Sequence, residues 1–197
     1  FLEEQAQAKQ KAQAAGDPPP QRQKFEAAEW WAKNWVGKEW AVPKGQEAKP
    51  VVWVTYKDAG AYARWAGLRL MTEFEYQRAG RRNGNGLFPW GDDPLDSGRC
   101  ATQDSRISEP LDVGALPEGA TEEGVHHLLG NVWEWTSSPF LPYPNYKDFS
   151  IEVGSGSQKR TLSGLTQWDA NRRVAVGGSF QNASIDARLT ARRGAER

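Results

Sequence analysis

The chain has 197 residues, of which 38% are hydrophobic, a size and composition suited to one domain with its own core. Its 25 basic and 25 acidic residues balance, so no net field would attract nucleic acid or an anionic membrane. No apolar run approaches the roughly 20 residues of a membrane-spanning helix. The sequence therefore predicts neither nucleic-acid binding nor membrane insertion, and it shows no signal peptide that would indicate a compartment.

Cysteine and tryptophan contents are the unusual features of the composition. The single cysteine, Cys100, excludes an intrachain disulfide and a thiol cluster for zinc, and we expect it to be a buried apolar residue. The ten Trp, 20 Gly and 12 Pro residues indicate a loop-rich domain in which large aromatic side chains anchor irregular segments.

Helices are predicted in the first part of the chain. Residues 1–15 are strong helix formers, and apolar residues at helical spacing predict a second helix over 25–35. The segment 57–67 predicts a third helix, which ends at its own glycine and turns Tyr62 and Trp65 inward.

A further helix is predicted over about 73–78. Thr72 and Glu75 match the capping box, in which the hydroxyl accepts from a free amide and the carboxylate accepts from the amide of the cap residue. The segment 81–127 is then rich in Gly, Pro, Asp and Ser, which predicts long ordered loops. Loops of that length inside a compact domain are usually functional or held by ions.

The motif GNVWEW, at residues 130–135, overlaps the first of two short predicted strands, 132–136 and 173–176. It places the carboxylate of Glu134 between two tryptophans. A buried carboxylate without a cation or hydrogen-bond donors costs several kcal/mol. Glu134 is therefore predicted to be either a metal ligand or a structural anchor.

Four stretches, in this order, match one known family. They are PVVWVTYKDAGAYARWAGLRLMTEFEYQRAG (50–80), FPWGDD (88–93), GNVWEWTSS (130–138) and RVAVGGSF (173–180). Together they resemble the formylglycine-generating-enzyme type of the C-type-lectin-like fold, over roughly residues 50–192. The resemblance implies a loop-rich α+β fold with two packed helices and a small antiparallel sheet. We expect residues 1–197 to form a single domain of this type, trimmed at both ends relative to the usual family pattern.

The resemblance also implies a calcium site. In calcium-binding members, the equivalents of Gly130 and Val132 offer backbone carbonyls and the equivalent of Glu134 offers a carboxylate, which are the hard oxygen ligands that calcium prefers. An asparagine that completes the site corresponds to His127 here, a poor calcium ligand, and Asn131 is a candidate replacement. Calcium at Glu134 thus stands beside the alternative of a structural Glu134 bonded to backbone amides, and no cofactor is required.

The family's known redox metals find few ligands in this sequence. The namesake oxidase holds copper on two cysteines after its Gly-Gly-Ser motif, and these positions are Asn182 and Ala187 here. Soft thiolates select copper(I), so the namesake's reaction is not expected. A related branch, the sulfoxide synthases of ergothioneine-type pathways, carries iron on histidines that come largely from another domain. His126 and His127 are adjacent, and on a strand they would point to opposite faces, so we do not expect them to bind one ion.

The missing ligands favour a non-catalytic binding scaffold. The segments 166–171 and 181–188 are polar and aperiodic, and the resemblance implies that they line one face. This arrangement resembles the variable proteins of diversity-generating retroelements, which display a diversified ligand-binding surface. The leading hypothesis is such a variable protein, which binds an unknown protein or other macromolecule. Its predicted binding residues are Trp168, Asp169, Asn171, Gln181, Asn182, Ser184, Ile185 and Asp186.

The alternative hypothesis is an accessory domain of an iron- or copper-dependent oxidase of the sulfatase-modifying type. An enzyme of that kind would add histidines or a second domain in the full-length sequence. The full-length sequence would therefore separate the two hypotheses.

Overall fold

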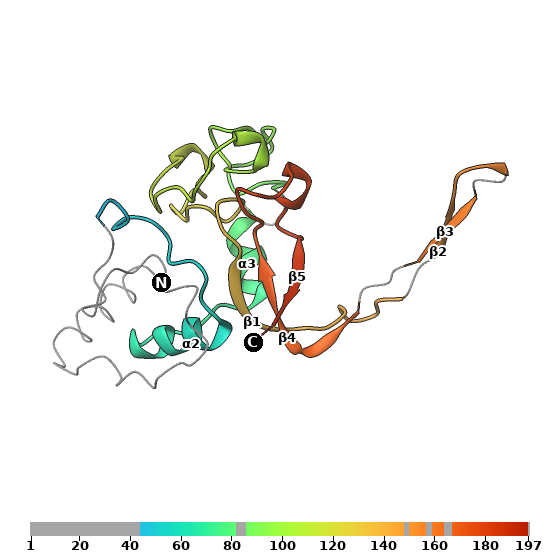
Figure 1. The fold of residues 1–197 in the computed structure, drawn as a ribbon, viewed down its shortest axis with the longest axis horizontal. Coiled ribbons are helices and arrows are strands. Elements are labelled where there is room, and N and C mark those ends of the chain that lie inside the picture. Colours follow the sequence, from blue (N-terminus) through green and yellow to red (C-terminus); the bar gives the residue numbers. More distant parts are fainter. Residues whose placement is uncertain (1–43, 82–85, 148–149, 157–158, 164–166, 197) are drawn as a thin grey trace.

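The structure is a computed structural model that describes residues 44–81, 86–147, 150–156, 159–163 and 167–196. The helices expected over 1–15 and 25–35 lie outside these residues. Helices α2 and α3 lie beside a three-stranded sheet, with a body of loops at one end of it (Figure 1). No helix in the described part of the chain is long and apolar enough to cross a membrane.

Helix α2 (Tyr56–Trp65) confirms the third predicted helix. It begins with a capping box, because the Asp58 amide donates to Thr55 Oγ1 at 3.2 Å and the Thr55 amide donates to Asp58 Oδ2 at 2.9 Å. The predicted orientation is wrong, since Tyr62 and Trp65 are 63% and 44% exposed. Their rings pack on each other instead, with centroids 5.6 Å apart.

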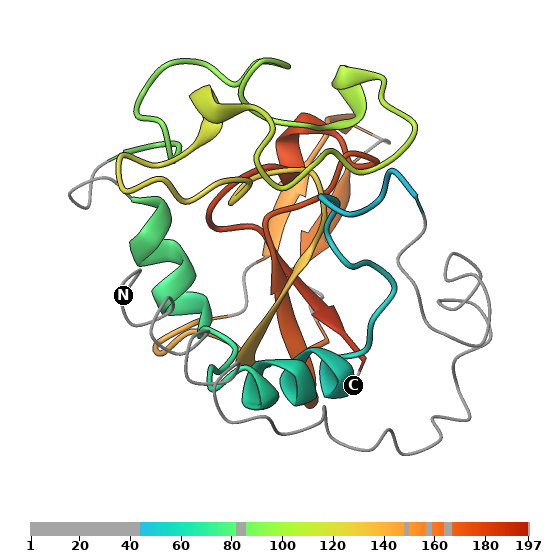
Figure 2. The same ribbon diagram turned by 90° about the vertical axis from the view of Figure 1, so that its left-hand side faces the viewer.

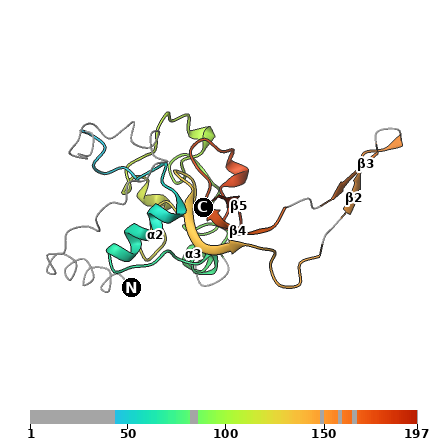
Figure 3. The same cartoon turned by 60° about the horizontal axis from the view of Figure 1, so that its bottom comes forward.

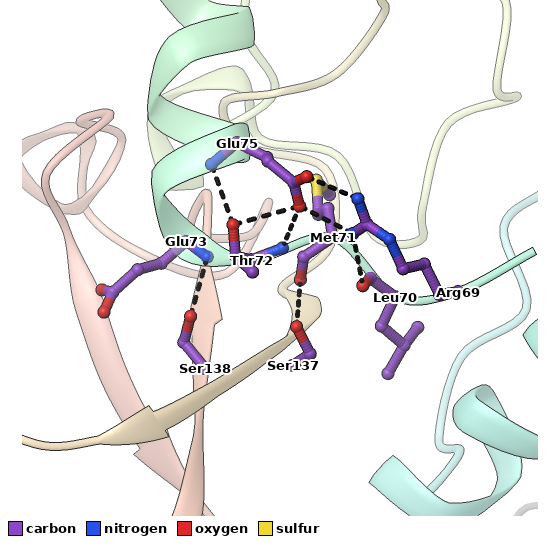
Figure 4. A network of polar contacts seen from close by, with 8 residues as sticks. All are labelled: Arg69, Leu70, Met71, Thr72, Glu73, Glu75, Ser137 and Ser138. Carbon is purple, nitrogen blue, oxygen red and sulfur yellow. Dashed lines mark hydrogen bonds and ion pairs between the residues drawn. The ribbon is translucent and has the colours of Figure 1, made fainter. Parts of the chain in front are cut away.

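Helix α3 (Glu73–Gly80) confirms the predicted capping box (Figure 4). The Glu75 amide donates to Thr72 Oγ1 at 3.1 Å, and the Thr72 amide donates to Glu75 Oε2 at 2.7 Å. The Arg69 guanidinium binds both oxygens of the same carboxylate, at 2.8 and 2.5 Å. These hydrogen bonds lower the pKa of Glu75 to about 2, so the cap stays charged.

The start of α3 is bonded to strand β1 (Glu134–Phe140) (Figure 4). The Ser137 amide donates to the Met71 carbonyl at 2.8 Å, and the Glu73 amide donates to Ser138 Oγ at 3.0 Å. The N-terminal end of α3 is therefore fixed to the sheet by a hydrogen bond from the free Glu73 amide as well as by packing.

Strand β1 pairs with β4 (Asp169–Val176), and β4 pairs with β5 (Arg192–Ala195), all antiparallel in the order β1-β4-β5. In this register Val176 lies opposite Glu134 on one side and Arg192 on the other. Both predicted strands are confirmed as β1 and β4, although β1 begins two residues after the predicted start at 132, whereas β5 was not predicted. Helix α2 runs across the foot of the sheet and α3 lies at its side (Figure 2).

Two further features complete the chain. Strands β2 (Ser150–Val153) and β3 (Arg160–Ser163) form an antiparallel ribbon that extends away from the rest (Figure 3). The predicted long loops are confirmed, and the described part of them contains only two short 3₁₀ helices, Gln103–Ser105 and Pro117–Gly119. A third 3₁₀ helix, Ser184–Asp186, follows β4.

The core lies between the sheet, α3 and the loops. Cys100 is fully buried in it, as predicted. The buried residues of this cluster are Tyr76, Cys100, Leu128, Leu129, Phe140, Val174, Val176, Ala187 and Leu189.

A buried ion pair joins α3 to β5. Arg192 Nε donates to Glu73 Oε2 at 2.6 Å and Arg192 Nη2 donates to Glu73 Oε1 at 3.0 Å, with only 9% and 5% of the two side chains exposed. The same guanidinium donates to the Leu141 carbonyl at 2.9 Å and lies 4.2 Å from the centroid of the Tyr143 ring. Helix, sheet and the segment after β1 therefore meet at Arg192.

Replacing Glu73 with glutamine should lower the free energy of unfolding by about 3 kcal/mol, because it leaves a buried guanidinium without its counter-charge. Urea denaturation measures this loss. The matched control is Glu152→Gln, which removes an exposed pair with Lys159 and should cost at most about 1 kcal/mol. Equal losses of unfolding free energy in the two variants would show that the buried Glu73–Arg192 pair stabilises the fold no more than an exposed pair does.

Candidate functional site

The first half of GNVWEW ties three loops together. Gly130 has φ +72°, and a Cβ here would clash with the Ala101 carbonyl, so only glycine fits. Asn131 donates its amide to that carbonyl at 2.9 Å, and its side chain exchanges two hydrogen bonds with Leu111, at 2.9 and 3.3 Å. Its carbonyl accepts from the Phe180 amide at 2.9 Å, next to the Gly-Gly-Ser motif.

The two tryptophans of the motif anchor separate segments. Trp133 Nε1 donates to Asn182 Oδ1 at 2.8 Å, and Trp135 Nε1 donates to the Val54 carbonyl at 3.1 Å. Because side chains alternate along a strand, Trp135 lies on one face of β1 and Glu134 lies on the other, and Trp133 directly precedes the strand. The carboxylate is thus not packed between the two rings, although it lies between them in the sequence.

Glu134 has a buried carboxylate oxygen, Oε2, with no hydrogen-bond partner among the described residues. Burial raises the pKa of Glu134 to about 7. The nearby Tyr76 hydroxyl donates to the Leu128 carbonyl and not to Glu134. Burial, and secondarily the charge of Glu134, raise the pKa of Tyr76 well above its usual value. No backbone amide of the described residues donates to this carboxylate, so the structural-anchor interpretation has no support, whereas an unpartnered buried carboxylate oxygen is compatible with a bound cation.

The residues expected to complete a calcium site are engaged elsewhere. His127 Nε2 lies 3.1 Å from the Asp112 carbonyl, and burial lowers the pKa of His127, which favours a neutral imidazole that donates to that carbonyl. The Asn131 side chain is bonded to Leu111 through both its oxygen and its nitrogen. A cation at Glu134 would depend on the carbonyls of Gly130 and Val132, and calcium at this place stays a prediction.

Redox-metal ligands are missing from the described residues, which contain no group of three or more His, Cys, Asp or Glu that could hold an ion. At the family's two copper positions, Ala187 is buried and Asn182 Oδ1 accepts from Trp133 and from Ser179 Oγ, the latter at 2.6 Å. Burial raises the pKa of Cys100 to about 12, so its thiol stays protonated and is a poor ligand.

A cavity of about 430 Å³ lies beside Ala187. Ser184, Ile185 and Ala187, which follow β4, form one wall, and Thr102 and Ser105, which belong to a loop, form another wall. Apolar and hydroxyl-bearing side chains thus face the same space, the mixture typical of small-molecule sites.

The predicted binding residues do not form one face. One group follows the C-terminal end of β4: Gln181, Asn182, Ser184, Ile185 and Asp186. The other group lies at its N-terminal end: Trp168, Asp169 and Asn171. At about 3.3 Å per residue the two ends of this strand are roughly 20 Å apart. Only Ser184 and Ile185 line the cavity, and their contact with a ligand stays a prediction.

Trp168 packs into the structure. Its ring centroid lies 5.0 Å from that of Phe140 and 5.4 Å from that of Tyr146, and the Arg192 guanidinium lies 5.4 Å from its centroid. Nearby, the Asn171 amide donates to Asp169 Oδ1 at 2.8 Å, which fixes the start of β4. These contacts explain the polar, aperiodic sequence here without a ligand.

Other cavity residues were missed. Thr102, Asp104 and Ser105 belong to a loop whose composition gave no functional signal, and it reaches the cavity only through a long-range contact. Arg188 lies within the polar segment after Gly-Gly-Ser and lines the cavity, although it was not among the predicted residues. The position of Arg188 in that segment was the sequence signal that could have identified it as a cavity residue.

Stability in calcium-free buffer should depend on Glu134 between about pH 4.5 and 7. The unfolded chain releases this proton near pH 4.5, whereas the folded protein holds it to about pH 7. Unfolding in this window therefore releases a proton. The contribution of Glu134 to the free energy of unfolding is complete below pH 4.5 and falls as the pH rises to 7, by about 1 kcal/mol per pH unit. Urea denaturation at several pH values should show this decline in the wild type, and Glu134→Gln should lack it.

Parallel pH profiles for the two proteins would contradict the assignment of the shifted pKa to Glu134. Repeating the series with excess calcium gives the control for the cation prediction. Bound calcium keeps the carboxylate charged, so it should remove the decline in the wild type and leave the variant unchanged.

Trp168→Ala should lower the free energy of unfolding by about 2–3 kcal/mol, since it removes an aromatic cluster that is partly buried against the core. Ile185→Ala is the control, because Ile185 is 65% exposed and should lose much less. Thermal and urea denaturation of both variants compare the two sites. A Trp168→Ala protein as stable as the wild type would mean that Trp168 does not anchor this region.

Known proteins resemble the chain in sequence and fold. A hercynine oxygenase from Mycolicibacterium thermoresistibile is 44% identical over 105 residues, which are 50% of this chain and 23% of the relative. A formylglycine-generating enzyme from Mycobacterium tuberculosis is 38% identical over 133 residues, 58% of this chain and 44% of the relative. The chain spans less than a third of the length of the curated hercynine oxygenases that it matches.

A solved structure, PvdO from Pseudomonas aeruginosa, superposes with a TM-score of 0.56 at 22% identity, over 76% of this chain and 57% of that one. At this identity the match supports the fold alone. The predicted α+β fold of the formylglycine-generating-enzyme type is confirmed.

The hypothesis of a non-catalytic variable protein is wrong, and so is the expectation that the chain has no enzymatic role. The relatives are named as oxygenases and formylglycine-generating enzymes, and none of these names indicates a display protein. The error has a physical reason. Loss of the thiolate pair at Asn182 and Ala187 argues against one copper site, but it does not argue against chemistry whose metal ligands lie elsewhere.

The family model for the sulfatase-modifying factor enzyme 1-like domain matches residues 5–197, nearly the whole chain. Its match agrees with the order of the motifs, the capped helices and the small antiparallel sheet. The chain belongs to the family of sulfatase-modifying factor enzyme 1-like domains.

Proposed function

We propose that this chain forms the substrate-binding part of an iron-dependent oxygenase of the hercynine oxygenase type. The supporting observation is the cavity of about 430 Å³ beside Ala187, at a position where the copper enzymes of the family carry a thiolate. Its volume falls within the roughly 300–1,000 Å³ of small-molecule sites. The thiolate ligands are missing while a cavity persists, which favours an oxygenase over a copper-dependent formylglycine-generating enzyme.

The described residues do not themselves fit an iron site, because they contain no suitable group of His, Cys, Asp or Glu. In the proposal, the iron ligands belong to residues outside the described ones, as in the branch of the family that takes its histidines from another domain. Iron, when bound, supplies the redox chemistry. In the proposal, the described residues bind and orient the substrate.

Two charged residues suit the proposed substrate. Asp104 and Arg188 line the cavity, both are exposed, and neither forms an ion pair or side-chain hydrogen bond with another described residue. Hercynine carries one carboxylate and one quaternary ammonium group. In the proposal Arg188 binds the carboxylate by charge-assisted hydrogen bonds, and Asp104 faces the cation. The apolar side chains of Leu95 and Ile185 cover the rest of the molecule.

Arg188→Gln should weaken hercynine binding by the full-length protein at least tenfold, about 1.4 kcal/mol, because it removes the proposed carboxylate partner. Isothermal titration calorimetry measures the Kd. Arg106→Gln is the charge-matched control, since Arg106 is exposed and close to the loop wall but does not line the cavity. Equal affinities of the wild type and Arg188→Gln would contradict the proposed orientation, and a wild type that binds no hercynine would contradict the proposed function.

A further inference from the structure

We infer that Asn182 is a positioning residue, which holds the two walls of the proposed substrate cavity together and against the sheet. The inference rests on the proposed function for the identity of the substrate. The claim that Asn182 holds the walls together rests only on the contacts of Asn182 and not on the identity of the substrate. The copper enzymes carry a metal-binding thiolate at this position, whereas in this chain the residue would have a positioning role.

The side-chain oxygen of Asn182 is fully used. It accepts from Trp133 Nε1 at 2.8 Å and from Ser179 Oγ at 2.6 Å, which occupy both of its lone pairs. An indole N–H only donates, so the atom that faces Trp133 must be the amide oxygen and not the amide nitrogen. The side chain therefore has one defined orientation.

The backbone of Asn182 joins the cavity walls. Its carbonyl accepts from the Gln103 amide at 2.8 Å, and its own amide donates to the Ser179 carbonyl at 3.0 Å. Gln103 starts the 3₁₀ helix that carries Ser105 on the loop wall, and Asn182 lies two residues before the 3₁₀ helix that carries Ser184 on the other wall. This hydrogen bond therefore links the two sides of the cavity.

Trp133 connects this link to the sheet. Trp133 directly precedes strand β1, whose next residue, Glu134, pairs with Val176 of β4. The Arg193 guanidinium of β5 lies 6.0 Å from the Trp133 ring centroid, which places the ring against the sheet. An acceptor at position 182 thus fixes the segment after Gly-Gly-Ser to a rigid element, as a precise binding site requires.

The chemistry predicts which side chains can replace Asn182. Aspartate keeps an oxygen acceptor at the same distance from the backbone, so Asn182→Asp should retain both side-chain hydrogen bonds. Leucine has a similar shape and no acceptor, and alanine is too short to reach Trp133. Gln181→Ala is the matched control, because Gln181 is the exposed neighbour and its side chain forms no hydrogen bond with another described residue.

The test compares these variants in the full-length protein, after melting curves confirm that each is folded. Hydrogen exchange of the Gln103 amide should be at least tenfold faster in Asn182→Leu and Asn182→Ala, and the Trp133 indole N–H resonance should shift toward that of a solvent-exposed indole. Asn182→Asp and Gln181→Ala should resemble the wild type. Hercynine Kd should rise about tenfold in the leucine and alanine variants and recover in the aspartate variant.

Each outcome has a distinct meaning. Unchanged exchange and an unchanged indole resonance in Asn182→Leu would overturn the positioning role. Faster exchange with unchanged hercynine affinity would overturn it as well, because the walls would then move without consequence for the substrate. If the wild type binds no hercynine, the proposed function fails, and the exchange rates and indole resonance still decide whether Asn182 holds the walls.

Discussion

The buried pair of Glu73 and Arg192 is the interaction on which the rest of the fold depends. Removing two charges from water is unfavourable unless their hydrogen bonds are satisfied, and here both carboxylate oxygens are engaged by one guanidinium. The same guanidinium reaches the Leu141 carbonyl and lies over Tyr143. A helix, an edge strand and the end of another strand therefore share one fixed point. A sheet of only three strands, covered largely by loops, needs such a point because regular structure alone supplies few contacts.

The alternation of side chains in the GNVWEW motif separates its anchoring tryptophans from its buried glutamate. Trp133 and Trp135 anchor distant segments through their indole N–H groups, while Glu134 faces the core side and its buried Oε2 has no donor among the described residues. A slip of one residue in the pairing would exchange these faces and bury the wrong groups. The register of β1 against β4 thus decides both the packing and the electrostatics of the motif, and the glycine at its start permits the close approach to Ala101.

Local signals predicted the parts of the structure that are held by local interactions. The capping box of Thr72 and Glu75 spans four residues, and α3 follows it as expected. Strand β5 and the ribbon of β2 and β3 depend on partners far along the chain, and no short pattern reveals such partners. Helical spacing placed Tyr62 and Trp65 on one face but did not show whether that face is buried. The loop wall that contains Ser105 was missed for the same reason, since a hydrogen bond from Gln103 to Asn182 brings it to the cavity.

The wrong functional hypothesis came from treating a metal's ligands and a substrate's cavity as one unit. In this structure they are separable. The cavity is built from a loop wall and a 3₁₀ helix, and its geometry depends on an acceptor at position 182 and not on a thiolate. An amide oxygen satisfies Trp133 and Ser179 without binding a soft metal. A chain of this family can therefore lose the copper pair and keep a shaped site, provided that the residue which replaces the thiolate still accepts these two hydrogen bonds. In the proposed function Asn182 supplies this acceptor, whereas an apolar residue there would leave Trp133 and Ser179 without it.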